Sequence, residues 1–335
     1  MQFDPELVDA LEALPGPEPD PADAVGMRRL QAAALLDATG GVPFTDDRVE
    51  FDDRLIPGPA GAPDVKVRVY RPRSQPASAA AFAYFHGGGF IAGDIEGVHV
   101  RAVMLAAEVG CVVLSVNYRL APEHPFPAGV EDCYAALLWI ADAADDLGLD
   151  PTRVAVGGES SGAALAAAVA LMARDRDGPA IAFQLLLYPV IDDRMQTASM
   201  RSAADAPIWN TRSCDVMWQH YLGNARGQSE PGVSSYAAPG RAVDVSSLPP
   251  AYISTCEGDP LRDEGIAYAQ RLLHAGVAVE LHNFAGTFHG FDMIGPTSVG
   301  KRALQEQVDV LRVALGQRSV TPRSVRRRRS GSNDQ

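Results

Sequence analysis

The stretch that decides the fold reads Val154-Ala155-Val156-Gly157-Gly158-Glu159-Ser160-Ser161-Gly162 and continues into the alanine-rich segment 163–173. The apolar residues ahead of the glycines predict a buried strand, and the alanines predict a helix. A serine at such a strand-to-helix turn projects its hydroxyl above the sheet, and the flanking glycines allow close backbone approach. Ser160 is therefore a candidate nucleophile. The alternative is a glycine-rich turn that only caps the helix.

Short apolar runs alternate with segments of helical period on both sides of this stretch. The expected strands are 81–85, 111–116, 154–156, 183–188, 251–255 and 279–284, and the expected helices are 98–108, 130–144, 163–174, 262–275 and 301–315. This alternation predicts an α/β fold with a mostly parallel sheet and helices on both faces. Ahead of it, the strict alternation of 65–70 predicts an exposed antiparallel edge hairpin with 49–56, which brings the sheet to eight strands.

Two segments do not follow this alternation. Residues 1–45 are acidic and proline-rich, and residues 191–222 lie between two core strands and carry several aromatic side chains. Long insertions after a strand commonly cover the site at the carboxyl ends of the strands. We therefore expect both segments to form a helical cap, with Trp209 lining the substrate pocket, over a catalytic core of 46–190 and 223–317. The alternative is that they are peripheral helices that cover the core.

A second glycine motif, His86-Gly87-Gly88-Gly89-Phe90, directly follows the expected strand 81–85. Successive glycines can turn backbone N–H groups toward one point, where the oxygen of a tetrahedral intermediate becomes negative. The N–H of Ser161, the residue after the nucleophile, supplies a further donor. The competing interpretation is a phosphate-binding loop, but no Lys-Ser/Thr pair follows the glycines.

A serine hydroxyl needs a base, and the base needs an orienting acid. In folds of this kind the order is serine, acid, histidine, each after a later strand. His289 directly follows the expected strand 279–284, whereas the remaining candidates fit less well: His86 and His124 precede the serine, His220 lies in the insertion, His274 on a helix and His282 within a strand. Asp259 is the expected acid, because it follows strand 251–255 and precedes Pro260; Glu257 and Asp263 stay open as alternatives.

The charge of the chain argues against polyanionic partners. The net charge is -13, and the tail 318–335 carries six arginines against one aspartate, which leaves about -18 on the rest of the chain. Such a body repels nucleic acid, and no basic stripe interleaved with aromatics is present. The tail itself is expected to be a disordered basic end, with a membrane or nucleic-acid contact as the alternative.

The cysteines and the chain start indicate a cytoplasmic protein. Cys111, Cys133, Cys214 and Cys256 are widely spaced without a Cys-x-x-Cys pair, as expected of core thiols in a reducing compartment. The first residues show no secretory signal pattern, and the longest apolar run, 163–173, is too short to span a bilayer. We therefore expect no membrane partner.

Taken together, His86–Phe90, Tyr118–Ala128, Gly158–Gly162, Asp259–Glu264 and Phe288–Phe291 resemble the hormone-sensitive-lipase-like esterases of bacteria, family IV of the α/β-hydrolase fold. The resemblance implies hydrolysis of small esters with short or medium acyl chains, without cofactor or metal. It also implies an oxyanion hole at Gly88 and Gly89, and frequent homodimers through the outer strand, here near Val279 to Phe284. The chain departs from the usual family pattern at Glu159 and Ser161, where Asp and Ala are commonest.

The resulting hypothesis is a serine carboxylesterase with the triad Ser160, His289 and Asp259. An amidase or peptidase with the same triad stays open, as does a ligand-binding protein without catalysis, although receptors of that kind resemble this family and have lost the histidine. An epoxide hydrolase would need an aspartate in place of Ser160. Because His289 must be neutral to act as a base, activity is expected to fall at acid pH.

Overall fold

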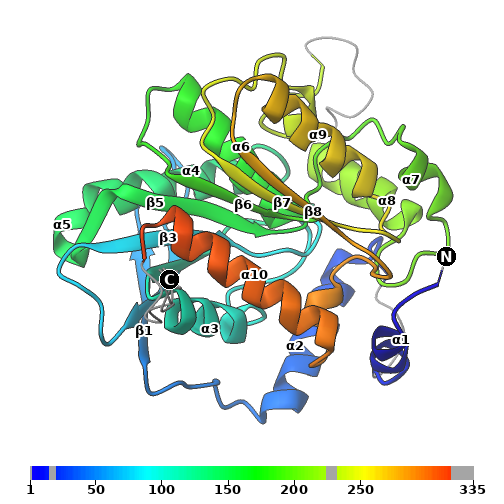
Figure 1. Cartoon of the computed structure of the whole chain (residues 1–335), viewed down its shortest axis with the longest axis horizontal. Helices are drawn as coiled ribbons and strands as arrows, with labels where there is room; N and C mark the ends of the chain where they lie inside the picture. The colour runs from blue at the N-terminus through cyan, green and yellow to red at the C-terminus, as the bar shows by residue number, and fades with distance from the viewer. Residues whose placement is uncertain (1, 15–19, 224–231, 318–335) are drawn as a thin grey trace, which may run out of the picture.

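The computed structural model describes residues 2–14, 20–223 and 232–317, so the basic tail lies outside the described residues (Figure 1). Its centre is an eight-stranded sheet in the order β1-β2-β4-β3-β5-β6-β7-β8. All neighbouring strands from β4 to β8 run parallel, whereas β2 is antiparallel to both β1 and β4. The expected α/β class with an eight-stranded, mostly parallel sheet is confirmed.

The strands and helices alternate along the chain. The strands are β1 (Val49–Ile56), β2 (Val65–Pro72), β3 (Ala79–Phe85), β4 (Val112–Asn117), β5 (Leu149–Glu159), β6 (Phe183–Leu187), β7 (Ala251–Cys256) and β8 (Val279–Phe284). The helices are α1 (Pro5–Glu12), α2 (Ala24–Thr39), α3 (His99–Val109), α4 (Ala128–Asp142), α5 (Ala144–Leu147), α6 (Ser161–Asp175), α7 (Ala198–Ser202), α8 (Thr211–Leu222), α9 (Arg262–His274) and α10 (Ser298–Ala314), with 3-10 turns η2 (Pro239–Arg241) and η3 (Phe291–Met293).

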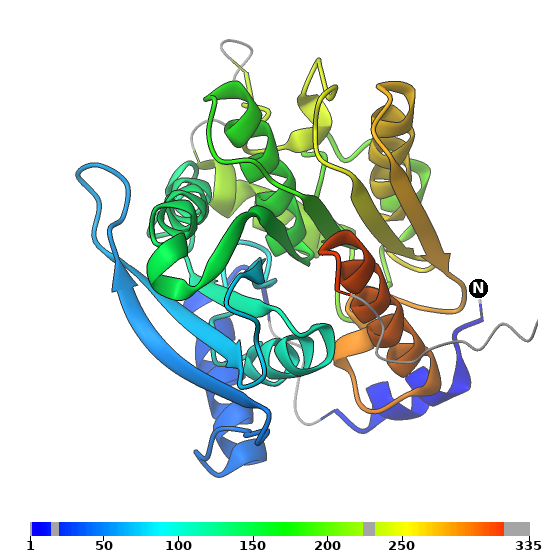
Figure 2. The same ribbon diagram turned by 60° about the vertical axis from the view of Figure 1, so that its left-hand side comes forward.

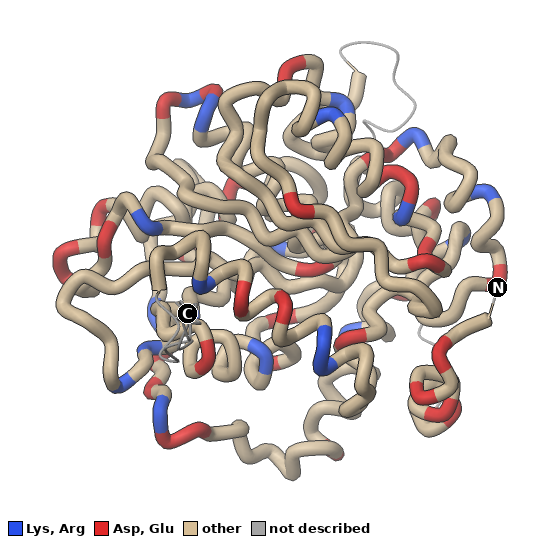
Figure 3. Tube along the Cα trace, in the orientation of Figure 1, with Lys and Arg blue, Asp and Glu red and all other residues tan. Residues whose placement is uncertain are grey.

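The sheet separates two hydrophobic cores. One core takes its helical residues mainly from α4, α6, α8 and α9, and the other from α3 and α10, which cross in front of the sheet in Figure 1. Strand β3 shows how one sequence serves both: Ala81, Ala83 and Phe85 belong to the first core, and Phe82 and Tyr84 to the second. Because successive side chains of a strand point to opposite faces, a strand covered on both sides must be apolar throughout. Charged residues are accordingly sparse on the central strands and gather around them (Figure 3).

The β1–β2 hairpin forms one edge of the sheet, and β8 forms the other (Figure 2). The expectation that this hairpin is exposed was wrong for β2. Arg68 and Tyr70, on the face expected to be solvated, are 6% and 0% exposed. Tyr70 donates to or accepts from His99 Nδ1 of α3 at 3.0 Å, and the Arg68 guanidinium binds Asp53 and Glu96. Helix α3 covers this face, so an alternating pattern here marks paired polar groups rather than solvent.

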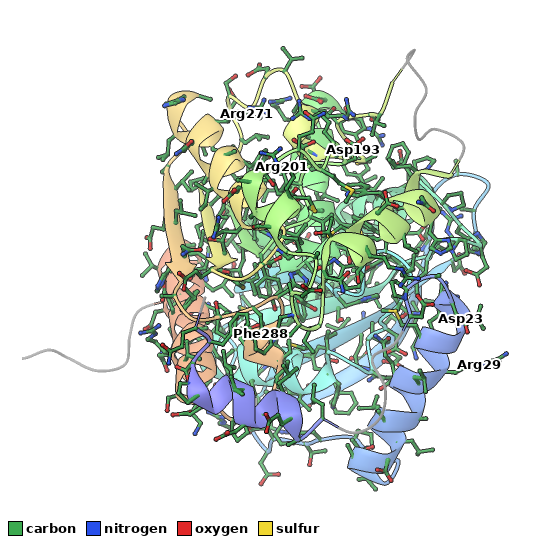
Figure 4. All side chains as sticks on the ribbon, turned by 90° about the vertical axis from the view of Figure 1, so that its right-hand side faces the viewer. Asp23, Arg29, Asp193, Arg201, Arg271 and Phe288 are labelled. Atoms are coloured by element: carbon green, nitrogen blue, oxygen red, sulfur yellow. The ribbon has the colours of Figure 1, made fainter. Side chains whose placement is uncertain are left out.

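The N-terminal segment divides between two places. Helix α1 packs beside the loop that follows β8: the Asp4 amide donates to Gly286 O at 2.8 Å, and the Phe3 ring meets Phe288 edge-on at 5.5 Å between centroids. Figure 4 shows Phe288 beside α1. Helix α2 lies instead against the loop after β3, where the Arg28 guanidinium donates to Ile91 O at 2.6 Å. The chain leaves the sheet again between β6 and β7, where α7 and α8 form.

Candidate active site

Ser160 sits on a sharp turn between β5 and α6. Its backbone has φ 56° and ψ -118°, a conformation that costs of order 1–3 kcal/mol for a residue with a side chain. The turn is tight because β3 lies against it: a Cβ at Gly158 would stand 2.0 Å from Phe85 O, and one at Gly162 would stand 1.9 Å from the same oxygen. Only glycine fits at both positions, which is the physical content of the Gly-x-Ser-x-Gly pattern.

The structure brings the two downstream residues to this serine. His289 Nε2 lies 2.9 Å from Ser160 Oγ, and His289 Nδ1 lies 2.7 Å from Asp259 Oδ2. The three side chains come from the loops after β5, β7 and β8, whose carboxyl ends meet at the same edge of the parallel sheet. All three residues are buried, with exposed fractions of 6% for Ser160, 6% for His289 and 1% for Asp259.

The alternative acids are engaged elsewhere. Glu257 Oε2 accepts from the amide of Gly286 at 2.7 Å, and Asp263 Oδ2 accepts from the amide of Ser199 at 2.8 Å. Asp259 uses its second oxygen, Oδ1, to accept from the Leu261 amide at 2.9 Å, which holds the carboxylate toward the imidazole. Of the candidate acids, Asp259 is therefore the one in contact with His289.

The loop after β3 borders the same site. Gly88 and Gly89 have φ values of 117° and 62°, and a Cβ at Gly88 would stand 2.2 Å from Ala92 O. Within the described part of the chain, neither amide donates a hydrogen bond, so both are available to a ligand. The amide of Ser161 begins α6, where first-turn N–H groups have no acceptor within the helix.

A cavity of about 680 Å³ opens over Ser160 and His289. Its wall includes Met27, Gln31 and Leu35 from α2, the residues His86, Gly87, Gly88 and Gly89 of the loop after β3, and Tyr188, Ile208, Trp209 and Ser213 from the segment after β6. The wall thus combines both segments that stand outside the α/β alternation. Among the described residues, no group of three or more His, Cys, Asp or Glu side chains could hold a metal ion.

Comparison with known proteins gives the family of this chain. The family model for the alpha/beta hydrolase fold matches residues 82–293. Esterase LipI of Mycobacterium tuberculosis is 41% identical over 266 residues, covering 78% of this chain and 82% of LipI. The chain belongs to the alpha/beta hydrolase family.

Further relatives place this α/β hydrolase among esterases. Carboxylesterase NlhH of M. tuberculosis is 39% identical over 270 residues, which cover 81% of this chain and 83% of NlhH. The solved structure of a bacterial heroin esterase is 44% identical and superposes with a TM-score of 0.89, over 95% of this chain and 99% of that one. The resemblance to the hormone-sensitive-lipase-like esterases is confirmed.

Two features of this α/β hydrolase were not found from the sequence. Arg28 of α2 binds both oxygens of Glu123 and also donates to Ala121 O, so it fastens α2 to the segment after β4. No motif marks Arg28, although Glu123 lies in the Tyr118–Ala128 motif. The second feature is the environment of His86. Its ring stacks on that of Tyr118 with 4.2 Å between the centroids, and burial lowers the pKa of His86 to about 4.

No helix in the described ranges is both long and apolar enough to cross a bilayer.

All four cysteines are buried free thiols.

Proposed function

We propose that this α/β hydrolase is a serine carboxylesterase in which Ser160 is the nucleophile, His289 the general base and Asp259 the orienting acid. The observation that carries the proposal is the continuous pair of hydrogen bonds, 2.9 Å from Ser160 to His289 and 2.7 Å from His289 to Asp259, at the wall of a 680 Å³ cavity. Both distances are within reach of proton transfer.

The chemistry follows two symmetrical steps. His289 takes the proton of Ser160 as the oxygen attacks the ester carbonyl, and Asp259 stabilises the imidazolium that forms. The imidazolium then protonates the leaving alkoxide, which yields an acyl-enzyme and an alcohol. Water attacks the acyl-enzyme as His289 takes its proton, and the imidazolium then returns that proton to Ser160 Oγ as the acid leaves.

The amides of Gly88, Gly89 and Ser161 form the oxyanion hole in this proposal. The support is that the two glycine amides have no acceptor within the described chain and border the cavity, and that the Ser161 amide stands at a helix N-terminus. Preorganised donors of this kind each lower the barrier by about 3 kcal/mol.

The substrates are proposed to be small esters of short or medium acyl chains. The cavity is large enough for such a molecule, and α2 and the segment after β6 supply apolar side chains to its wall. These two segments, 1–45 and 191–222, are proposed as the cap over the core 46–190 and 223–317. The buried free thiols support a reducing compartment, for which we propose the cytoplasm.

The test is hydrolysis of p-nitrophenyl esters of increasing acyl length, with a p-nitroanilide of the same acid alongside. Ser160→Ala and His289→Ala are expected to lower kcat by about 10⁴-fold or more, and Asp259→Asn by a similar factor, because the triad acts as a unit. His274→Ala, which changes an exposed histidine on α9, serves as the matched control.

Each alternative has its own outcome in this experiment. Faster turnover of the anilide than of the ester would favour an amidase. A wild-type protein that binds esters without turnover would be a ligand-binding relative. Activity that survives Ser160→Ala would exclude the proposed nucleophile.

A further inference from the structure

Glu159, the residue before the proposed nucleophile, is a buried carboxylate with two specific partners. It ends β5 and is 5% exposed. Its Oε2 accepts from the hydroxyl of Tyr84 at 2.7 Å, and its Oε1 accepts from the backbone amide of Gly87 at 2.8 Å. Both partners belong to the neighbouring strand β3 and its following loop, so one side chain joins the nucleophile turn to the loop of His86–Phe90.

The bond to Gly87 acts directly beside the proposed oxyanion donors. Gly87 immediately precedes Gly88, and the planar peptide between them transmits the orientation of one residue to the next. Packing reinforces the bond, because a Cβ built on Gly87 would stand 3.1 Å from both Glu159 Cγ and Glu159 O. The loop is therefore held against Glu159 by a hydrogen bond and by close contact.

The surroundings compensate part of the cost of burying a charge here, and the net pKa of Glu159 stays raised. Burial raises the pKa of Glu159, and the positive charge of Arg101 and the two hydrogen bonds oppose this effect. Arg101 is itself buried and bound to Asp292 and Gln307. A buried network of this kind is stable only when every charge has its partner. A carboxylate at position 159 without these partners would therefore destabilise the fold.

We propose that Glu159 is a positioning residue that holds the loop His86–Phe90, which carries two of the proposed oxyanion donors, in register with Ser160. Resting on the serine-esterase function proposed above, it acts through Gly87 on the adjoining amides of Gly88 and Gly89 and does not touch the substrate. The commoner family residue at this position, Asp, is one methylene shorter. With β5 in place, its carboxylate would fall roughly 1.5 Å short of bridging Tyr84 and Gly87.

The test compares three substitutions by steady-state kinetics. Glu159→Gln keeps an oxygen for the Gly87 amide and can donate its NH₂ to the Tyr84 hydroxyl oxygen, so kcat is expected within about threefold of wild type. Glu159→Ala and Glu159→Asp lose the bridge, and kcat is expected to fall about tenfold or more with KM changed less than threefold, because the oxyanion exists only after attack. Affinity for a phenylboronic acid, which forms a tetrahedral adduct on the serine, is expected to fall in step with kcat.

Two further variants separate positioning from general stability. Tyr84→Phe removes only the second partner and is expected to lower kcat less than Glu159→Asp does. Leu311→Ala leaves a cavity in the core under α10, far along the chain from the site, and is expected to lower the melting temperature with kcat unchanged. If Glu159→Ala does not fold, the comparison of Glu159→Gln with Glu159→Asp carries the test.

The outcomes distinguish this proposal from the one on which it rests. A wild-type protein that does not hydrolyse esters would contradict the proposed esterase function itself. An active wild type in which Glu159→Asp and Glu159→Ala keep kcat and boronate affinity would overturn the role of Glu159. Equal losses in Glu159→Gln and Glu159→Ala would overturn it too, because they would point to charge rather than to position.

Discussion

Trp209, in the segment after β6, lies close both to Gly89, a proposed oxyanion donor, and to His289, the proposed base. A Cβ on Gly89 would stand 2.8 Å from Trp209 Cη2, and the indole lies 6.1 Å from the His289 ring between centroids. The ring thus limits the space beside Gly89 in the loop after β3. We expect Trp209→Ala to shift the best substrate toward longer acyl chains, because removing the indole enlarges the cavity.

The measurement is kcat/KM for p-nitrophenyl esters of increasing length. Trp218→Phe is the matched control, since Trp218 is buried in the same segment and does not line the cavity. If Trp209→Ala has the same preference for acyl chain length as wild type, Trp209 does not line the acyl pocket.

His86 makes stability depend on pH. Burial lowers its pKa to about 4 in the folded protein, against about 6.5 in an unfolded chain. Between these values the unfolded state binds more protons, so the free energy of unfolding falls as the pH drops from about 6.5 to about 4, by up to about 1.4 kcal/mol per pH unit. Above about pH 6.5 this contribution is fully present.

The expected result is a smaller loss of stability on acidification in His86→Gln than in wild type. Urea unfolding at about pH 7 and about pH 5 measures it, with an expected difference of about 2 kcal/mol in the pH-dependent loss. Parallel pH dependences of the two proteins would show that the imidazole does not titrate in this way.

At the scale of elements, the loop that carries His289 is tied to α3 and α10 by a buried ion pair. Arg101 Nη2 of α3 lies 2.9 Å from Asp292 Oδ2 of η3, and the two side chains are 8% and 1% exposed. The Asp292 carboxylate also accepts from Tyr188 Oη and Gln307 Nε2. Burial raises the pKa of Asp292, but Arg101 and these hydrogen bonds outweigh it, and the net pKa is lowered.

Asp292→Asn is expected to lower the free energy of unfolding by about 3 kcal/mol, because it leaves the Arg101 charge buried without its counter-charge. Urea unfolding monitored by circular dichroism checks this, and Asp309→Asn on the exposed face of α10 is expected to change stability by less than about 0.5 kcal/mol. Similar stabilities of the two variants would show that the ion pair contributes little.

At the scale of the whole molecule, β8 leaves one edge of the sheet open. Leu281 on this strand is 40% exposed, and Leu55 on β1, at the opposite edge, is 72% exposed. We expect a homodimer in which two β8 strands pair, because an uncovered edge strand presents free backbone donors and acceptors. In an antiparallel pairing, Leu281→Glu would set like charges close to each other and weaken the dimer.

Size-exclusion chromatography with light scattering measures this. Leu281→Glu is expected to elute as a monomer at concentrations where wild type and Leu55→Glu are dimers. A wild type that is monomeric, or a Leu55→Glu variant that dissociates instead, would contradict pairing through β8.

The sequence by itself determined the class of fold, the order of the strands along the chain, and the candidates Ser160, His289 and Asp259. These features are local: glycines that a tight turn requires, apolar runs that a doubly covered strand requires, and polar residues just after strands. The sequence left Glu257 and Asp263 open beside Asp259, because all three follow the same strand.

Only the tertiary structure decided among them, since what separates the three carboxylates is the partner each meets: Asp259 meets His289, Glu257 the Gly286 amide and Asp263 the Ser199 amide. The same holds for Arg68, a buried guanidinium that pairs with the half-buried carboxylates of Asp53 and Glu96, and for Glu159, whose partners come from another strand and its loop. Hydrogen bonds and desolvation depend on which groups lie within about 3 Å, and for residues distant in the chain that proximity exists only after the sheet has assembled.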